Sequence, residues 1–221
     1  MKNFEHLFQQ HQSRFSSKWQ HYFAVYDRFF SRFINQKFTL LEIGVSLGGS
    51  LQLWKKYFGS HVSVIGIDNN SQSYFEESQI QIFIGDQTDK KFLENVLNTI
   101  SNPAIIIDDG SHIQSHILKT FEILYPALSD NGIYVIEDCH TAYWPRFEGG
   151  VNSHLNVVDI FSRSAHDVNS KWYNVPKTVR IPQLDSISFH DSMIILEKRQ
   201  KDYKRNMVEV DRSGPRIRDT I

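Results

Sequence analysis

The chain has 221 residues, of which 40% are hydrophobic and 22% are charged, a composition typical of a globular protein with one domain and extensions. Its formal net charge of −1 argues against nucleic-acid binding, which usually requires a strongly basic face. The single cysteine, Cys139, excludes an intramolecular disulfide, and no stretch has the length of a membrane span or signal segment, so we expect a cytoplasmic protein without membrane insertion.

Aromatic side chains recur at spacings of three and four along residues 15–33, which predicts an amphipathic helix within an N-terminal extension, residues 1–36. We expect this helix to pack against the domain; a contact in a homo-oligomer or a substrate lid is the alternative. Residues before the helix are expected to be frayed. The stripe consists of Phe15, Trp19, Tyr22, Phe23, Tyr26, Phe29, Phe30 and Phe33.

From residue 37 onward, short apolar runs alternate with amphipathic runs. This alternation predicts repeated β-α units, and hence a parallel sheet with helices on both faces and right-handed crossovers. The predicted strands are residues 38–43, 62–68, 79–84, 104–109 and 132–137. One predicted helix follows a glycine-rich turn and ends at residue 58. Two more predicted helices span residues 88–100 and 111–124.

The end of the predicted domain, which spans residues 37–200, has a different pattern. Two short apolar runs, residues 187–189 and 193–196, flank a turn with no crossover helix, so one late strand should run antiparallel. Before them, the insertion at residues 139–182 is long enough to act as a substrate-recognition region.

That insertion contains a predicted helix at about residues 153–166. After the domain, residues 201–221 form a polar and charged tail that is expected to be poorly ordered unless a partner orders it.

Carboxylates follow two of the predicted strands, in Asp108-Asp109 and in Glu137-Asp138. The carboxyl ends of parallel strands form the ligand-binding edge of an open α/β sheet. Crowded carboxylates repel one another and must protonate, pair with a base or hold a cation. Since neither motif contains Lys or Arg, a hard divalent metal is the economical interpretation. Asp108 is less suited to ligation than Asp109, because adjacent strand residues point to opposite faces.

The glycine-rich turn at residues 44–50 lets the backbone approach a ligand closely. Ser46 occupies the second glycine position of the dinucleotide fingerprint, which argues against a dehydrogenase. Glu42 precedes this turn, and Asp68 and Asp86 end the second and third strands, where an acidic side chain can accept hydrogen bonds from ribose. Each residue alone is as readily explained as a helix cap or turn former; their combination favours a nucleotide site.

These motifs together resemble class I S-adenosylmethionine-dependent methyltransferases. More narrowly, the chain is similar to the macrocin and mycinamicin sugar O-methyltransferases, which also resemble cephalosporin-hydroxylase-like proteins. The likeness covers residues 38–144, and more loosely the hairpin around Asp191. It implies a Rossmann-like α/β fold with a seven-stranded, mostly parallel sheet in the order 3-2-1-4-5-7-6, whose seventh strand is antiparallel.

The resemblance also implies roles for individual residues. It implies S-adenosylmethionine and Mg²⁺ as cofactors, and His112 as the general base. The residues implied to contact S-adenosylmethionine are Glu42, Gly44, Ser50, Asp68, Gly85, Asp86 and Asp108. The implied magnesium ligands are Asp109, Glu137 and Asp138.

The leading hypothesis is methyl transfer to a hydroxyl of a sugar or glycosylated natural product, a small-molecule acceptor. His140, Tyr143 and Trp144 closely follow the acidic motif, where they line the acceptor pocket or pack in the core. A hydroxylase-like enzyme is one alternative, although iron oxygenases usually present two histidines and one carboxylate. A noncatalytic protein of the same fold is the other alternative.

Overall fold

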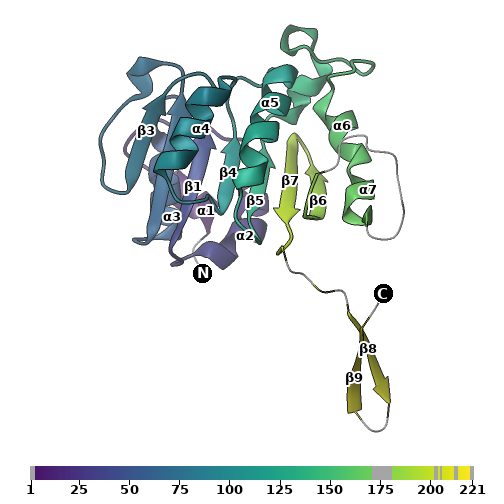
Figure 1. Ribbon diagram of the computed structural model, residues 1–221. Helices are drawn as coiled ribbons and strands as arrows, with labels where there is room; N and C mark the ends of the chain where they lie inside the picture. Colours follow the sequence, from purple (N-terminus) through teal and green to yellow (C-terminus); the bar gives the residue numbers. More distant parts are fainter. Residues whose placement is uncertain (1–2, 171–180, 202–203, 205, 212–213, 220–221) are drawn as a thin grey trace.

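The computed structural model describes residues 3–170, 181–201, 204, 206–211 and 214–219. Its centre is a seven-stranded sheet in the order β3-β2-β1-β4-β5-β7-β6 (Figure 1). The first five strands pair in parallel, whereas β7 pairs antiparallel with β5 and β6. The predicted strand order and the antiparallel late strand are confirmed. The strands are β1 Phe38–Ile43, β2 Val62–Asp68, β3 Ile80–Ile84, β4 Ile105–Asp108, β5 Ile133–Ile136, β6 Leu184–His190 and β7 Met193–Lys198.

Helices cover both faces of this sheet, as the β-α pattern predicts (Figure 1). Alternate strand residues point to opposite faces, so Leu40 packs in one core and Leu41 in the other. The first core holds the aromatic side chains of the N-terminal helices and α3; the second holds those of α5 and α6. The helices that follow β1 are α3 Gly49–Phe58, α4 Lys90–Thr99, α5 Gln114–Leu124, α6 Val157–Arg163 and α7 Ala165–Val168.

The start of α5 differs from the prediction in a way that matters for the site. The helix begins at Gln114, with Ile113 as its N-cap, and not at residue 111. His112 has a φ of 58°, in the left-handed region, which is incompatible with a first helical turn. His112 therefore lies on the loop between β4 and α5.

The N-terminal extension also differs from the prediction. It contains two separate helices, α1 Phe4–Gln9 and α2 Tyr22–Phe30, followed by a short 3-10 turn, Ser31–Phe33. The predicted continuous helix over residues 15–33 is wrong in its first part. Residues 10–21, which we call the N-terminal strap, cross the carboxyl edge of the sheet without helical structure.

The strap is tied to the domain by its backbone. Gly49 N–H donates to the carbonyl of Phe15 (3.1 Å), and Arg14 N–H donates to the side chain of Gln52 (3.1 Å). The side chains of Phe15 and Trp19 are 64% and 54% exposed, so the first members of the aromatic stripe do not pack in the core.

By contrast, Phe4 is fully buried, although the residues before the stripe were expected to be frayed. Its ring packs against Trp54, with centroids 4.6 Å apart, and against Tyr26 at 5.0 Å. Tyr22, Tyr26 and Phe30 are buried within the same chain, which agrees with the expectation that this part of the stripe packs against the domain.

The polar tail contains strands β8 Asn206–Asp211 and β9 Gly214–Asp219, which pair as an antiparallel hairpin that Figure 1 draws apart from the central sheet. This part of the tail is therefore ordered as β-structure. Within the 139–182 insertion, residues 171–180 lie outside the described residues, and the helix predicted at about 153–166 is present as α6 and α7.

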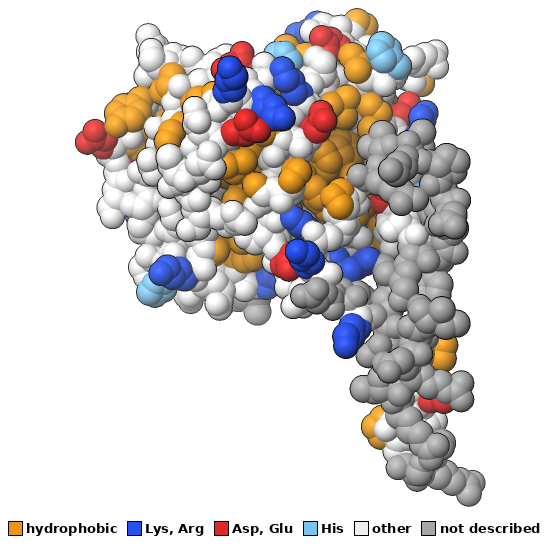
Figure 2. All heavy atoms as spheres, in the orientation of Figure 1, with side chains coloured by type: hydrophobic (Ala, Val, Ile, Leu, Met, Phe, Trp, Pro, Cys, Tyr) orange, Lys and Arg blue, Asp and Glu red, His pale blue; other side chains and the backbone are white. Residues whose placement is uncertain are grey.

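The face seen in Figure 2 carries acidic and basic side chains interspersed among hydrophobic ones. This mixture of charges on the visible face agrees with the net charge of −1. Among the helices that the structure describes, none has the length and apolarity needed to cross a membrane.

Candidate active site

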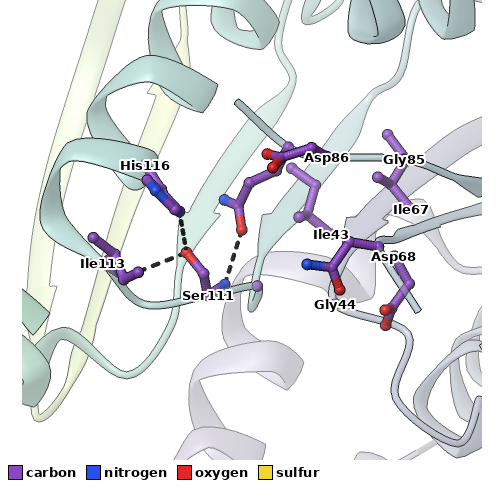
Figure 3. A pocket seen from close by; sticks show the side chains of 12 residues that line it. Ile43, Gly44, Ile67, Asp68, Gly85, Asp86, Ser111, Ile113 and His116 are labelled. Atoms are coloured by element: carbon purple, nitrogen blue, oxygen red, sulfur yellow. Dashed lines mark hydrogen bonds between the residues drawn. The ribbon is translucent and has the colours of Figure 1, made fainter. Parts of the chain in front are cut away.

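Two adjoining cavities open at the carboxyl ends of the parallel strands, with volumes of about 280 and 320 Å³. Gly44, Asp68 and Gly110 line both of them. Four residues predicted to contact the cofactor, Gly44, Asp68, Gly85 and Asp86, line the first cavity, which is shown in Figure 3. We call the first the nucleotide cavity and the second the acceptor cavity.

The glycine-rich turn is held by Asp68 across the nucleotide cavity. Its Oδ2 accepts hydrogen bonds from the backbone N–H groups of Val45 and Ser46, both at 2.9 Å. Gly44 has a φ of 93°, and a Cβ added there would lie 2.0 Å from the carbonyl oxygen of Asp109. Only glycine permits this approach, which brings the turn against the loop that carries the acidic motif.

The far side of the nucleotide cavity contains polar residues that the sequence analysis did not single out. Ser111 N–H donates to Gln87 Oε1 (2.8 Å), and Ser111 Oγ lies 2.9 Å from His116 Nδ1 (Figure 3). Asp86 accepts hydrogen bonds from the backbone and hydroxyl of Thr88, which lower the pKa of this carboxyl group. No sequence motif marks Gln87 and His116 as part of this site, because they come together only where the chain crosses over to α5.

Glu42 and Asp108, which are also predicted to contact the cofactor, are buried next to these cavities and are not among the residues that line either of them. Both are on central strands with less than 2% exposure. Burial raises the pKa of each to about 7. Glu42 accepts hydrogen bonds from Ser50 Oγ (3.0 Å) and Trp54 Nε1 (3.1 Å), so it supports α3, while Ser50 itself borders the acceptor cavity.

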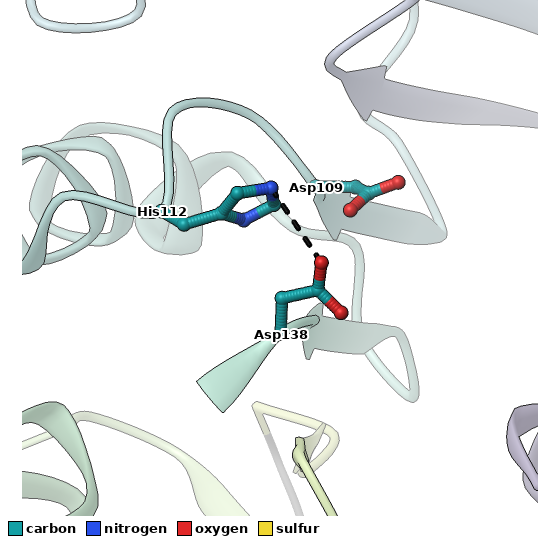
Figure 4. Close-up of side chains that lie close together, drawn as sticks. All are labelled: Asp109, His112 and Asp138. Carbon is teal, nitrogen blue, oxygen red and sulfur yellow. Dashed lines mark ion pairs between the residues drawn. The ribbon is translucent and has the colours of Figure 1, made fainter. Parts of the chain in front are cut away.

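The acceptor cavity contains an acidic cluster. Asp109, His112 and Asp138 each offer one potential metal-ligating atom, and these atoms lie within 4.8 Å of one another. His112 Nε2 is 3.6 Å from Asp138 Oδ2 (Figure 4). Tyr22 Oη donates to Asp138 Oδ1 (2.8 Å), which fixes this carboxylate on its side of the cavity. The structure thus brings together two of the predicted metal ligands and the predicted base.

Glu137, the third predicted ligand, lies outside this cluster. It is 1% exposed and binds Lys18 of the strap, with Nζ 2.7 Å from Oε2. The same Nζ is 2.6 Å from Asp109 Oδ2, and Tyr26 Oη donates to Glu137 Oε1 (2.6 Å). Neither acidic motif contains Lys or Arg, but in the folded chain Lys18 reaches both motifs, from 91 residues away in the sequence for Asp109 and 119 for Glu137.

The charge balance around Lys18 follows from its burial. Burial alone would lower the pKa of the Lys18 ammonium group, but the carboxylates of Asp109 and Glu137 raise it well above its usual value. Burial raises the pKa of Glu137 to about 8, against the opposing effect of Lys18. The Lys18 ammonium group thus favours the ionised form of Glu137, and burial opposes it.

Aromatic side chains border the acidic cluster. Trp19 Nε1 donates to Asp138 Oδ1 (3.2 Å), and the ring of Trp19 lies edge-on to that of His140, with centroids 6.0 Å apart. His140 packs in turn against Trp144 (4.7 Å) and hydrogen-bonds to Ser192 Oγ. Trp144 and the predicted pocket residue Tyr143 are 41% and 50% exposed, so neither belongs to the core.

Known proteins resemble this chain in sequence and in structure. No family model matches the chain. It is 33% identical over 198 residues, 83% of this chain and 52% of the relative, to 8-demethyl-8-α-L-rhamnosyl tetracenomycin-C 2′-O-methyltransferase of Streptomyces olivaceus. It is 41% identical over 137 residues, 58% of this chain and 34% of the relative, to mycinamicin VI 2″-O-methyltransferase of Micromonospora griseorubida.

Among solved structures, the chain matches the MycE methyltransferase of the mycinamycin biosynthetic pathway in its complex with Mg, SAH and mycinamycin VI. The TM-score is 0.82 at 27% identity, over 91% of this chain and 54% of MycE. The chain is homologous to sugar O-methyltransferases of the macrocin and mycinamicin family. Its fold is that of a class I methyltransferase, and its matches cover between 34% and 52% of the length of the curated sugar O-methyltransferases.

Proposed function

We propose that this protein transfers a methyl group from S-adenosylmethionine to a hydroxyl of a sugar or glycosylated natural product, in a reaction that requires Mg²⁺. The observation that carries the proposal is the pair of adjoining cavities, one beside the glycine-rich turn and one beside the acidic cluster. Donor and acceptor would meet where Gly44 and Gly110 line both cavities.

The nucleotide cavity is lined by polar groups to which a nucleoside can hydrogen-bond, among them Asp68 and Asp86. Three backbone N–H groups, those of Val45, Ser46 and Asn70, donate to the Asp68 carboxylate. A carboxylate has about four acceptor positions, so one can still accept a hydrogen bond from a ribose hydroxyl. The absence of a side chain at Gly44 leaves the backbone open to the methionine part of the cofactor.

The acidic cluster suits a hard divalent cation, because Asp109 and Asp138 offer carboxylate oxygens beside the acceptor cavity. Bound there, Mg²⁺ would acidify and orient the acceptor hydroxyl. The cluster presents one histidine and two carboxylates, the reverse of the set usual in iron oxygenases, which argues against the hydroxylase-like alternative. Trp19 and Trp144 offer exposed aromatic faces beside the cluster, on which a sugar ring can pack.

His112 is the residue that accepts the hydroxyl proton in this proposal. It lines the acceptor cavity from the loop before α5, outside the helix, and its Nε2 faces Asp138 (Figure 4). We expect His112→Gln to lower the rate by about 10²-fold, the usual contribution of a general base, while Mg²⁺ still binds. Rates at saturating donor and acceptor, with calorimetric Mg²⁺ titration alongside, measure both effects.

The control for this variant is His154→Gln, which removes an exposed histidine of the insertion. Its rate should equal that of the wild type. An unchanged rate in His112→Gln would contradict the role as base, and loss of Mg²⁺ binding would make His112 a metal ligand instead.

Calorimetric titration with S-adenosylhomocysteine, in Mg²⁺ and again in EDTA, tests the proposed function directly. We expect micromolar binding in both, and at least about tenfold weaker binding for Asp68→Ala, equivalent to about 1.4 kcal/mol. Asp159→Ala, which removes an exposed carboxylate in α6, is the matched control. Methylation of glycosides should then require Mg²⁺; no binding by the wild type would remove the methyltransferase proposal.

A further inference from the structure

The ammonium group of Lys18 occupies the space between two carboxylates of the predicted metal site. Its Nζ lies 2.6 Å from Asp109 Oδ2 and 2.7 Å from Glu137 Oε2, with Glu42 Oε1 at 3.5 Å. The Lys18 side chain is 4% exposed, so these carboxylates are its immediate surroundings. A cation already sits where the sequence predicts one.

A divalent metal and this ammonium group cannot share the same oxygens. Mg²⁺ binds oxygen at about 2.0–2.1 Å, so an ion ligated by Asp109 Oδ2 and Glu137 Oε2 would overlap Nζ. An ion held by the accessible side of Asp109 and by Asp138 would still lie a few ångströms from a buried positive charge, and the two cations would repel strongly in that environment.

We propose that Lys18 and a divalent metal ion are alternative occupants of the Asp109–Glu137 carboxylate pair, and that the metal binds by displacing Lys18. This inference rests on the proposed function, because it takes Asp109 of the acidic cluster to hold the metal and adds Glu137 as a further ligand. Lys18 keeps Asp109 and Glu137 together in the metal-free protein, and Glu137 becomes a ligand only when Lys18 leaves.

The exchange couples the metal to the strap. Phe15, Ser16, Ser17 and Lys18 line the acceptor cavity, so displacement of Lys18 changes one wall of that cavity. Other contacts still hold the strap when Lys18 leaves, among them the bond from Gly49 N–H to the Phe15 carbonyl and the bond from Trp19 to Asp138. By thermodynamic reciprocity, whatever Lys18 gains from the carboxylates is subtracted from the affinity for the metal.

Metal affinity in a Lys18 variant tests the inference. In calorimetric titrations with Mg²⁺ or Mn²⁺, we expect Lys18→Met to bind the metal about tenfold more tightly than the wild type, since a charge-neutral side chain of similar length no longer competes. Lys18→Arg, which keeps the charge, should show no such gain. Lys37→Met removes an exposed lysine from the loop before β1 and controls for the change in net charge.

Equal or weaker metal binding by Lys18→Met than by the wild type would overturn the competition while leaving the proposed function in place. Absence of metal binding in both proteins would overturn the competition together with the metal requirement of the proposed function.

Proteolysis of the wild-type protein gives a readout that does not depend on a foldable variant. A lysine-specific endoprotease cannot reach the buried Lys18 side chain in the metal-free protein. We expect Mg²⁺ to accelerate cleavage after Lys18 several-fold, relative to cleavage after the exposed Lys37 measured in the same digest by mass spectrometry. A cleavage rate at Lys18 that Mg²⁺ leaves unchanged, or lowers, would contradict displacement.

Discussion

Replacement of Asp109 by asparagine is expected to lower the rate of methyl transfer by about 10³-fold, the upper range for loss of one electrostatic contact to the transition state. Asp109 lies in the acidic cluster and also binds Lys18, so it contributes to the site whether the bound cation is a metal ion or the Lys18 ammonium group. Asparagine keeps the shape of the side chain but removes the charge that holds a metal. The rate at saturating donor and glycoside acceptor gives the result.

Cofactor binding should survive in Asp109→Asn, because Asp109 borders the acceptor cavity and not the nucleotide cavity. Titration with S-adenosylhomocysteine should therefore give an affinity within about threefold of the wild type, a difference below about 0.7 kcal/mol. Asp159→Asn provides the matched exposed carboxylate. Loss of cofactor binding with turnover preserved would contradict the assignment of the two cavities.

Replacement of Phe4 by alanine is expected to lower the free energy of unfolding by about 3–5 kcal/mol, the usual cost of truncating a buried aromatic side chain. Phe4 is fully buried, with its ring against Trp54, Tyr26 and Tyr57. Its loss would leave a cavity beneath the strap that the neighbouring rings cannot fill by small movements. Urea denaturation followed by tryptophan fluorescence measures the change.

The control is Phe15→Ala in the same extension, whose side chain is 64% exposed. This substitution should change the free energy of unfolding by no more than about 0.5 kcal/mol. A large loss in Phe15→Ala together with a small loss in Phe4→Ala would favour the continuous helix that the aromatic spacing predicts over the structure described here.

The sheet is the part of the fold that the sequence predicts well. The predicted bounds of β1 and β2 are confirmed to the residue, because each apolar run ends at a residue with a special backbone or polar role, at Gly44 and at Asp68. The start of α5 was misplaced because the left-handed conformation of His112 has no hydrophobic signature. The spacing of apolar residues indicates which face of a helix is buried, but it does not mark the residue at which the helix begins.

The N-terminal extension shows why periodicity fails there. Phe15 and Trp19 continue the spacing of the helical residues of α2, yet they are exposed, because the backbone of the strap bonds to α3 and not to itself. Nothing in the spacing distinguishes these residues from Tyr22 and Tyr26. Tertiary contacts decide the outcome, and they involve residues distant in the chain.

The candidate site was predicted from local motifs, and its missing parts are those that come from elsewhere. Asp109, His112 and Asp138 meet because parallel strands end at one edge of the sheet, a rule that can be applied to sequence alone. Lys18 and Trp19 arrive from the strap and could not be paired with these carboxylates before the path of the strap was known.

The close backbone approach at Gly44 has a consequence for how precisely the reaction is arranged. The turn beside the cofactor and the loop that carries Asp109 touch through main-chain atoms, reinforced by the bond from Asp109 N–H to the Ile43 carbonyl (3.0 Å). Main-chain atoms have no rotamers, so in the proposed reaction the separation between methyl donor and acceptor would be set by a contact that side-chain motion cannot loosen. If the proposed function holds, substitutions in the strap and the insertion would change acceptor preference without disturbing the distance over which the methyl group travels.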